Sequence, residues 1–368
     1  MTQEDTKKLK SLEDKPRFLK SLEDKPRFLL EVNLKPLQGD RFQPTGFPDL
    51  GAATYDAPDG TKMLLVESVQ SMANRMELVC WDAAKNELVE PLKGLCYVEV
   101  EDENGEKFTN SILEAHRIGS TYLLKAEKST IDEIFKNEFN KKSEKKNKES
   151  NKLKPYSTKD LAKLLFEYDI GSLLHGVFLP LYGGGRCRIT RALSAFIEAK
   201  NVKVVDSGGV KIDIINPGQR SSNDEGKKAS EEGYGNIIYP RREYTAEKIT
   251  AFFNLDLALI RSYELGKDQE DLLIALAIFK IRKFIDSNLR LRTACDLKAE
   301  GTEIKEPTGF ELPTYNEILE VLPDLISKCK KEDHSPFLTG KYIKERNVKK
   351  EDSSSEDDED SSSEDKNE

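Results

Sequence analysis

The chain has 368 residues, of which 37% are hydrophobic and 34% charged, and a formal net charge of −9. No apolar run approaches the roughly 20 residues that span a bilayer, and the opening MTQEDTKKLK lacks the apolar stretch of a signal peptide, so we expect a cytoplasmic protein without a membrane partner. Residues 350–368 hold ten acidic residues against two lysines, and the remainder is nearly balanced. Net charge therefore neither favours nor excludes a nucleic-acid partner.

The chain begins with a tandem duplication, KSLEDKPRFL at residues 10–19 and again at 20–29. We expect the second copy to run into the first strand and the first copy to be a dispensable part of an N-terminal extension, residues 1–28. Residues 136–154 hold eight lysines and three glutamates without an apolar period, which predicts a mobile insertion within a single domain, residues 29–345. The acidic, Ser-rich tail, residues 346–368, should be disordered.

Apolar periodicity predicts a mixture of strands and helices between these ends. Alternating or short apolar runs predict strands at 29–34, 63–67, 95–101, 173–179 and 202–206. Helical spacing predicts helices over 69–80, 245–263 and 271–285, the last largely buried, and a helix-like pattern also runs through 192–197. Residues 288–297 alternate again. The class is α+β, with a helix-backed, mixed or antiparallel sheet.

The five cysteines are Cys80, Cys96, Cys187, Cys295 and Cys329, scattered without CxxC spacing or a nearby histidine. This pattern argues against a structural zinc site and against a disulfide scaffold. We expect ordinary buried or half-buried thiols, no bound metal and no cofactor.

A Gly-rich stretch, GGGRCRIT, is the first candidate site. It is not a P-loop, because GxxxxGK[ST] needs a lysine and a hydroxyl side chain that are absent at that spacing. Glycines let a backbone approach a phosphate closely, and guanidinium groups grip phosphates, so the stretch suits a polyanion tracked along its backbone. The same residues are about equally compatible with a structural role, as a Gly-rich turn whose arginines pair with surface carboxylates. The residues concerned are Gly183, Gly184, Gly185, Arg186, Arg188 and Arg191.

Two further segments interleave cations with aromatic or apolar residues. In 233–249, Tyr234, Tyr239 and Tyr244 alternate with Arg241 and Arg242, a composition that suits single-stranded nucleic acid, although loop aromatics also serve as core anchors. In 288–297, Arg290 and Arg292 share one face of a predicted strand, where they contact phosphate or are simply solvated.

Catalytic signals are poor. Of the three histidines, His175 in LLHGVFL is the one candidate for a general base near the Gly-rich stretch, and a lone histidine in an apolar strand is more often structural. No HExxH, GxSxG or paired-acid motif occurs.

Six segments, taken in order, resemble the Csb-type RAMP protein, the Cas-seven backbone subunit of type I CRISPR surveillance complexes of subtype U or G. They are RFQPTGFPDLGAATY (41–55), LLVESVQSMANRME (64–77), LLHGVFL (173–179), GGGRCRITRALSAFIEA (183–199), EEGYGNIIYPRREYTA (231–246) and NLRLRTACDL (288–297). The resemblance spans roughly residues 29–330. The duplicated N-terminus, the Lys-rich insertion and the acidic tail lie outside the matching segments.

The resemblance implies a modified RRM-like (ferredoxin-like) palm with helical and loop insertions. It also implies a non-catalytic subunit whose copies assemble along a CRISPR guide RNA, beside other subunits, and present the spacer for pairing with target DNA. Gly183, Gly184, Gly185, Arg186, Arg188 and Arg191 would then lie near the RNA, with Arg241, Arg242, Arg290 and Arg292 as weaker candidates. An endoribonuclease that uses His175 as base and a scaffold that binds protein through its acidic tail are the alternatives.

Overall fold

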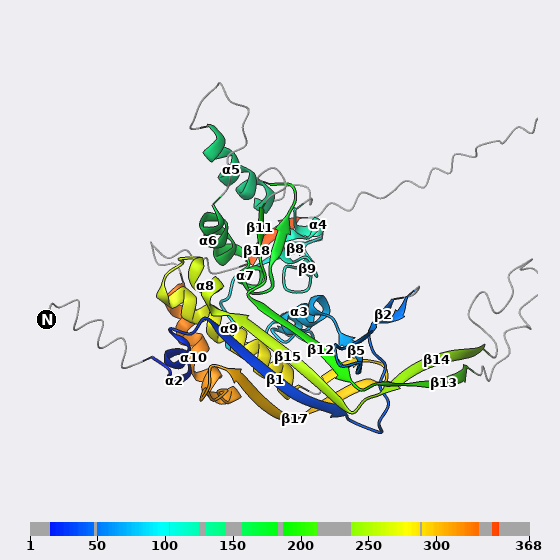
Figure 1. Cartoon of the computed structure of the whole chain (residues 1–368). Coiled ribbons are helices and arrows are strands. Elements are labelled where there is room, and N and C mark those ends of the chain that lie inside the picture. Colours follow the sequence, from blue (N-terminus) through cyan, green and yellow to red (C-terminus); the bar gives the residue numbers. More distant parts are fainter. Residues whose placement is uncertain are drawn as a thin grey trace, which may run out of the picture.

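A seven-stranded antiparallel sheet forms the centre of the fold (Figure 1). The computed structural model describes residues 15–47, 50–102, 104–124, 130–144, 157–182, 187–211, 237–287, 289–330 and 341–345. In their order across the sheet, the strands are β16 (Leu289–Arg292), β17 (Cys295–Glu306), β1 (Arg27–Pro36), β15 (Lys248–Asp256), β12 (Leu193–Lys200), β5 (Lys62–Glu67) and β4 (Thr54–Asp56). The α+β class is thereby confirmed.

Helices cover the buried face of this sheet. Every second residue of β12 from Leu193 to Ala199 is buried, and β1 alternates in the same way from Phe28 to Leu34. The helix α3 (Val69–Leu78) packs on β12, and α9 (Lys267–Asp286) packs on β17 and on α3. Because α9 is apolar almost all round, it is covered on its other sides too, by α8 (Leu257–Ser262) and α10 (Tyr315–Cys329). The helices expected at 69–80 and 271–285 are confirmed.

Two segments that were expected to be helical are strands. Residues 193–197 of the first segment belong to β12, and the second segment, 245–263, holds β15 followed by the short helix α8. The alternation in both strands was hidden by apolar residues on the outer face, where Phe196 and Phe252 stack with ring centroids 4.9 Å apart. The helical prediction was wrong because cross-strand pairing outweighed the helix propensity of Ala, Leu and Glu.

The strand expected at 173–179 is half helix and half strand. Residues Ile170–His175 form α7, which ends at Gly176, and β10 (Val177–Leu179) follows. Gly176 has a φ of +78°, and a Cβ on it would lie 3.0 Å from the Ile189 carbonyl oxygen. The chain therefore reverses here at a position that only glycine fills without strain.

The two copies of the duplicated decamer fold differently. In the first copy, Arg17 begins the helix α2 (Arg17–Leu22), whose Phe18 and Leu19 are buried. In the second copy, Arg27 begins β1, as expected, and Phe28 is buried. Since α2 packs on α9, the first copy is not a detached extension, and residues 15–28 belong to the packed body. Residues 1–14 lie outside the described part of the chain.

A smaller unit lies above the sheet in Figure 1. Its three-stranded sheet consists of β18 (Lys341–Glu345), β8 (Tyr97–Glu101) and β9 (Lys107–Asn110). The chain between residues 81 and 189 also forms β6 (Trp81–Asp82), β7 (Glu87–Leu88), η1 (Glu90–Leu92), η2 (Arg117–Gly119), α4 (Thr121–Leu124), α5 (Thr130–Glu144), α6 (Thr158–Tyr168) and the β10–β11 ribbon, in which β11 is Cys187–Ile189. The expected mobile insertion at 136–154 begins as the second half of α5, while 145–154 and the tail, 346–368, lie outside the described residues.

A long hairpin, β13 (Lys203–Lys211) with β14 (Ile237–Thr245), projects from the edge of the body, as does the short pair β2 (Gly46–Phe47) and β3 (Gly51–Ala52) (Figure 1). The hairpin confirms the strand expected at 202–206, and Phe42 pairs with Tyr244 at its base. Within the described residues, no helix is both long and apolar enough to cross a membrane.

Candidate nucleic-acid interface

The β10–β11 ribbon presents a ring and a guanidinium side by side. Phe178 and Arg188 are cross-strand partners at its centre, and both are exposed, Phe178 by 56%. Their neighbours along each strand are buried, because alternate residues of a strand point to opposite faces. Arg188 is thus placed by a strand, whereas Gly183, Gly184, Gly185 and Arg186 of the predicted Gly/Arg site lie outside the described residues.

Arg191, the last arginine of that predicted site, is half-buried and held by two hydrogen bonds. Its Nε donates to the His175 carbonyl oxygen at 3.1 Å, and its Nη2 donates to Gln70 Oε1 at 2.9 Å. Burial, and then the charge of Arg117, lower the pKa of Arg191. Arg191 therefore joins α7 to the start of α3 and still contributes positive charge.

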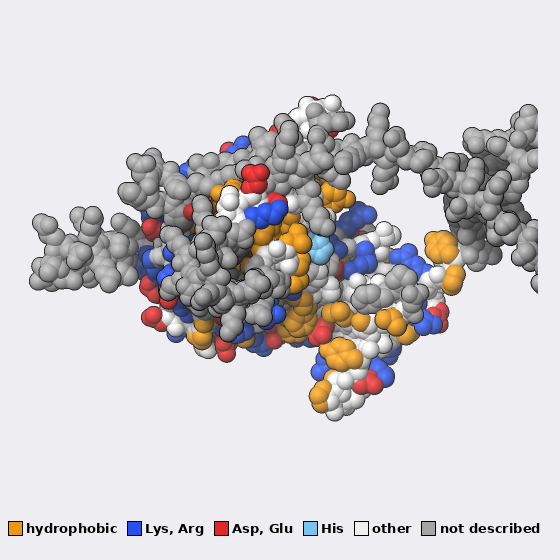
Figure 2. All heavy atoms as spheres, turned by 90° about the horizontal axis from the view of Figure 1, so that it is seen from above, with side chains coloured by type: hydrophobic (Ala, Val, Ile, Leu, Met, Phe, Trp, Pro, Cys, Tyr) orange, Lys and Arg blue, Asp and Glu red, His pale blue; other side chains and the backbone are white. Residues whose placement is uncertain are grey.

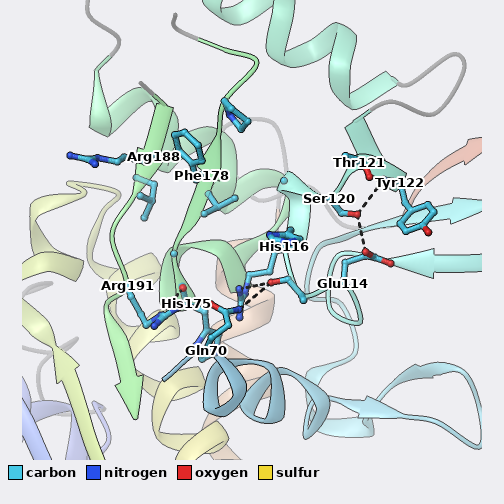
Figure 3. Close-up of a pocket in the computed structure, with 17 residues that line it drawn as sticks. Gln70, Glu114, His116, Ser120, Thr121, Tyr122, His175, Phe178, Arg188 and Arg191 are labelled. Carbon is cyan, nitrogen blue, oxygen red and sulfur yellow. Dashed lines mark hydrogen bonds between the residues drawn. The ribbon is translucent and has the colours of Figure 1, made fainter. Parts of the chain in front are cut away.

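Both arginines line a cavity of about 900 Å³ (Figure 3). In the figure, Phe178 and Arg188 lie near each other, Arg191, His175 and Gln70 lie below them, and His116 lies to their right. Figure 2 looks down on this side of the molecule and shows a surface histidine beside a group of Lys and Arg side chains. The remaining lining residues come mainly from η2, α4 and their flanks: Glu114, Ala115, Arg117, Gly119, Ser120, Thr121, Tyr122, Gly176, Val177, Pro180 and Ile189.

A buried charge cluster supports the floor of this cavity. Glu77 of α3 accepts from Lys280 Nζ of α9 at 2.8 Å, and its other oxygen lies 3.4 Å from Arg117 Nε and 3.6 Å from His175 Nε2. The side chains of these four residues are between 0% and 4% exposed. One carboxylate thus ties together α3, α7, α9 and η2.

The electrostatics of the cluster keep His175 neutral. Burial, and then the charges of Lys280, Arg117 and Arg191, lower the pKa of His175 well below its ordinary value. Lys280 Nζ lies 3.2 Å from His175 Nε2, and a lysine ammonium can only donate, so Nε2 is the acceptor. Asp169, which accepts from the Ile118 amide and the Ser172 hydroxyl, has its pKa raised to about 6 by burial and by Glu77.

The other predicted arginines divide into two kinds. Arg241 and Arg292 meet at Gln43: Arg241 Nε donates to the Gln43 side chain at 2.9 Å, and Arg292 Nη1 to its carbonyl oxygen at 3.0 Å. Arg292 also pairs with the buried Glu67. These contacts give Arg292 a structural partner that the sequence did not reveal.

Arg242 and Arg290 are largely exposed, by 65% and 75% of their side chains, and their ion pairs with Asp206 and Asp296 are solvated. Solvated pairs of this kind hold an arginine weakly, so both side chains can turn to an anion. Of the predicted tyrosines, Tyr244 is a buried anchor, Tyr239 is 46% exposed on the hairpin, and Tyr234 lies outside the described residues.

The helix α3 links the cavity to the Gln43 group. Its first turn carries Gln70, which holds Arg191, and its last turn carries Arg75, which donates to the carbonyl oxygens of Arg290 and Leu291. The structure therefore brings Arg188 and Arg191 to one cavity, whereas Arg241 and Arg292 meet at Gln43.

The sequence analysis missed several residues of the site, chiefly Phe178, His116, Arg117, Glu77 and Lys280. A signal existed for two of them, because Glu77 and Lys280 interrupt otherwise apolar helix faces, and a charge in such a position requires a buried partner. All five cysteines are buried and free, as expected. Among the described residues, no group of three or more His, Cys, Asp or Glu side chains could hold a metal ion.

Comparison with known proteins gives one family match. The model of the family described as "CRISPR-associated protein GSU0053" matches residues 28–204, which run from β1 into β13 and include the cavity residues from Gln70 to Arg191. No curated protein matches the chain.

Solved structures offer distant likenesses. A chain of a "CRISPR RNA-guided surveillance complex, pre-nicking" has a TM-score of 0.38 and 12% identity, covering 76% of this chain and 75% of that one. A chain of a "CRISPR RNA-guided surveillance complex" has a TM-score of 0.35 and 12% identity, covering 84% and 77%. Csc2 of Thermofilum pendens has a TM-score of 0.27 and 11% identity, covering 83% and 77%. These scores are too low to support conclusions about this chain. The family match confirms the resemblance found in the sequence segments: residues 28–204 of the chain match the model of the CRISPR-associated GSU0053 proteins.

Proposed function

We propose that this chain is a non-catalytic backbone subunit of a CRISPR surveillance complex in the cytoplasm. Its copies bind guide RNA, assemble along the spacer beside other subunits, and present the spacer for pairing with target DNA. The observation that carries the proposal is the composition of the cavity. Its lining includes an exposed ring, Phe178, the neighbouring Arg188, and Arg191. Rings stack on unpaired bases and guanidinium groups bind phosphates, which is the combination that single-stranded RNA needs.

We infer that the central sheet is a modified RRM-like palm. In chain order β1, α3, β12, β15, α9 and β17 follow a βαββαβ sequence, and their strands lie side by side as β17-β1-β15-β12 with every neighbour antiparallel. This connectivity and strand order support a ferredoxin-like palm. The smaller unit and the projecting hairpin are then insertions between its elements.

The surroundings of His175 favour binding over RNA cleavage. A general base must reach the proton it removes, and the His175 ring is fully buried, with Nε2 occupied by Lys280. Its lowered pKa also makes it a poor proton acceptor. We therefore expect His175→Gln to leave the lengths of precursor RNA products unchanged. Uncut precursor with this variant, in a protein that still folds, would favour the nuclease instead.

Salt-dependent RNA binding tests the proposal. Each phosphate neutralised on a single strand adds about 0.7 to the slope of log affinity against log salt concentration. We expect Arg188→Ala to weaken binding of single-stranded RNA and to reduce this slope by about 0.7. The matched control is Arg17→Ala, since Arg17 lies on α2 with its side chain 89% exposed, and it should change neither quantity. Equal effects of the two variants would contradict the proposed interface.

A further inference from the structure

The floor of the cavity carries more positive than negative charge. Glu77 is the acidic partner that Arg117 and Lys280 share. Arg191 adds a third cation, and it donates hydrogen bonds to uncharged groups, the Gln70 side chain and the His175 carbonyl oxygen. Two further acids lie close by. Glu114 lines the cavity and accepts hydrogen bonds from Thr109 and Ser120, and Asp169 accepts through Oδ2 from Ile118 and Ser172. An anion entering the cavity would therefore meet unbalanced positive charge.

Arg117 has a hydrogen-bond donor that could bind such an anion. The residue lines the cavity and is 3% exposed, yet its Nη2 has no hydrogen-bond partner within the described residues. A buried donor without an acceptor is costly, so native structures rarely leave one without a reason. Arg117 also has a φ of +50°, a left-handed conformation that arginine seldom adopts. Strained backbone of this kind is concentrated at binding and catalytic sites.

The positions of the cation and the ring are fixed relative to each other. A Cβ on Gly119, at the end of the same 3₁₀ turn as Arg117, would lie 3.0 Å from the Phe178 carbonyl oxygen, so η2 and β10 are in close contact. Phe178 lines the cavity with 56% of its surface exposed. In Figure 3, His116 lies to the side of the ring and of Arg191, and all three residues line the cavity. The cavity thus has a cationic floor and an apolar, planar wall on two adjoining rigid pieces.

We propose that this cavity is a subsite for one nucleotide of the bound RNA, with the phosphate facing Arg117 and Arg191 and the base unstacked from its neighbours and lying against Phe178. The inference rests on the proposed function and adds a fixed position at which each subunit grips one nucleotide. The cavity volume of about 900 Å³ lies within the usual range for small-molecule sites, so it accommodates a nucleotide.

Photo-crosslinking tests the position of the base. A uridine oligonucleotide with one 5-iodouridine, irradiated on the full-length protein, should crosslink to the peptide that contains Phe178. Phe178→Ala should abolish this crosslink and weaken RNA binding by about 5- to 150-fold, the range for one stacked base. Because Phe178 is exposed, the variant should melt like the parent. The control Tyr55→Ala removes a ring of similar exposure, 45%, on β4, and should change neither result.

A neutral linkage tests the position of the phosphate without altering the protein. Replacing the phosphate next to the crosslinking nucleotide by a methylphosphonate should weaken binding by about 10- to 150-fold, the value of a lost charge-assisted hydrogen bond. In Arg117→Gln the same replacement should cost much less, because the group that reads the charge is gone.

The outcomes separate the two proposals. RNA that binds tightly but crosslinks elsewhere, with Phe178→Ala unaffected, overturns the subsite and leaves the proposed function standing. Failure of the parent protein to bind single-stranded RNA overturns both.

Discussion

Replacing Glu77 by glutamine tests whether the charge cluster beneath the cavity is as buried as its contacts indicate. The carboxylate is the partner of Lys280 at 2.8 Å and lies 3.4 Å from Arg117. Glutamine keeps the shape of the side chain and removes its charge. Both cations, with side chains 3% and 1% exposed, would then remain without their acidic partner, and an uncompensated buried charge is strongly destabilising.

The expected magnitude follows from this burial. Breaking a buried ion pair by removing one partner costs about 3–5 kcal/mol. For roughly 270 folded residues, an unfolding entropy of about 2.1 cal/mol/K per residue converts this loss into a drop of about 5–9 °C in melting temperature. Thermal and urea-induced unfolding of the parent and of Glu77→Gln, followed by circular dichroism, would measure both quantities.

Two further variants make this measurement specific. Asp286→Asn removes the acid of a partly exposed i,i+4 pair with Arg282 on α9, and should cost less than about 1 kcal/mol. Adding Lys280→Met to Glu77→Gln should recover part of the lost stability, because it removes the stranded charge. A melting temperature of Glu77→Gln that equals that of Asp286→Asn would refute the reasoning, since it would mean that the cluster is solvated.

Three other predictions concern neighbouring residues. Burial and Glu77 raise the pKa of Asp169 to about 6, so its contribution to stability is present below the unfolded pKa of about 3.9 and is lost as the pH rises through about 6. Asp169→Asn should therefore gain about 3 kcal/mol relative to the parent between pH 4 and pH 7 in urea unfolding, and no gain would mean an ionised, solvated carboxyl. A Cβ on Gly171 would lie 2.5 Å from Glu77 Oε1, so Gly171→Ala should lower the free energy of unfolding by about 1–3 kcal/mol. This loss should be non-additive with that of Glu77→Gln, and additive losses would mean that the two residues do not interact. Arg292→Gln leaves the buried Glu67 with one cation, Arg75 at 3.5 Å, and should lower the melting temperature, whereas Arg290→Gln, on a 75% exposed side chain, should not. Equal melting of the two variants would contradict the structural role of Arg292.

Local periodicity predicted those elements whose apolar pattern is complete within the segment. The strand at 29–34 and the helix at 271–285 are of this kind: every second residue of the strand is buried, and the helix is buried almost all round. It failed at β12 and β15, where Phe196 and Phe252 pair on the outer face and conceal the alternation. The duplicated decamer makes the limit plain: KPRFL begins a helix at Arg17 and a strand at Arg27, so contacts distant in the sequence decide the local structure.

The site was predicted in part for a related reason. Arg188 and Arg191 stand out in one stretch of sequence, and the structure places both at the cavity. Arg117 comes from a turn about seventy residues earlier, and Phe178 from a strand that the sequence marked only as apolar. Only the folded chain brings a ring, a strained arginine and two further cations to one cavity.

The most direct test of the central claim is the nucleic acid that the protein retains. We would purify the full-length chain from cells that also express a CRISPR array, treat it with nuclease, and determine both the sequence and length of the protected RNA and the mass of the particle. The account predicts RNA of uniform length that carries spacer sequence, in particles that hold several copies of the chain. A nucleic-acid-free monomer would contradict it.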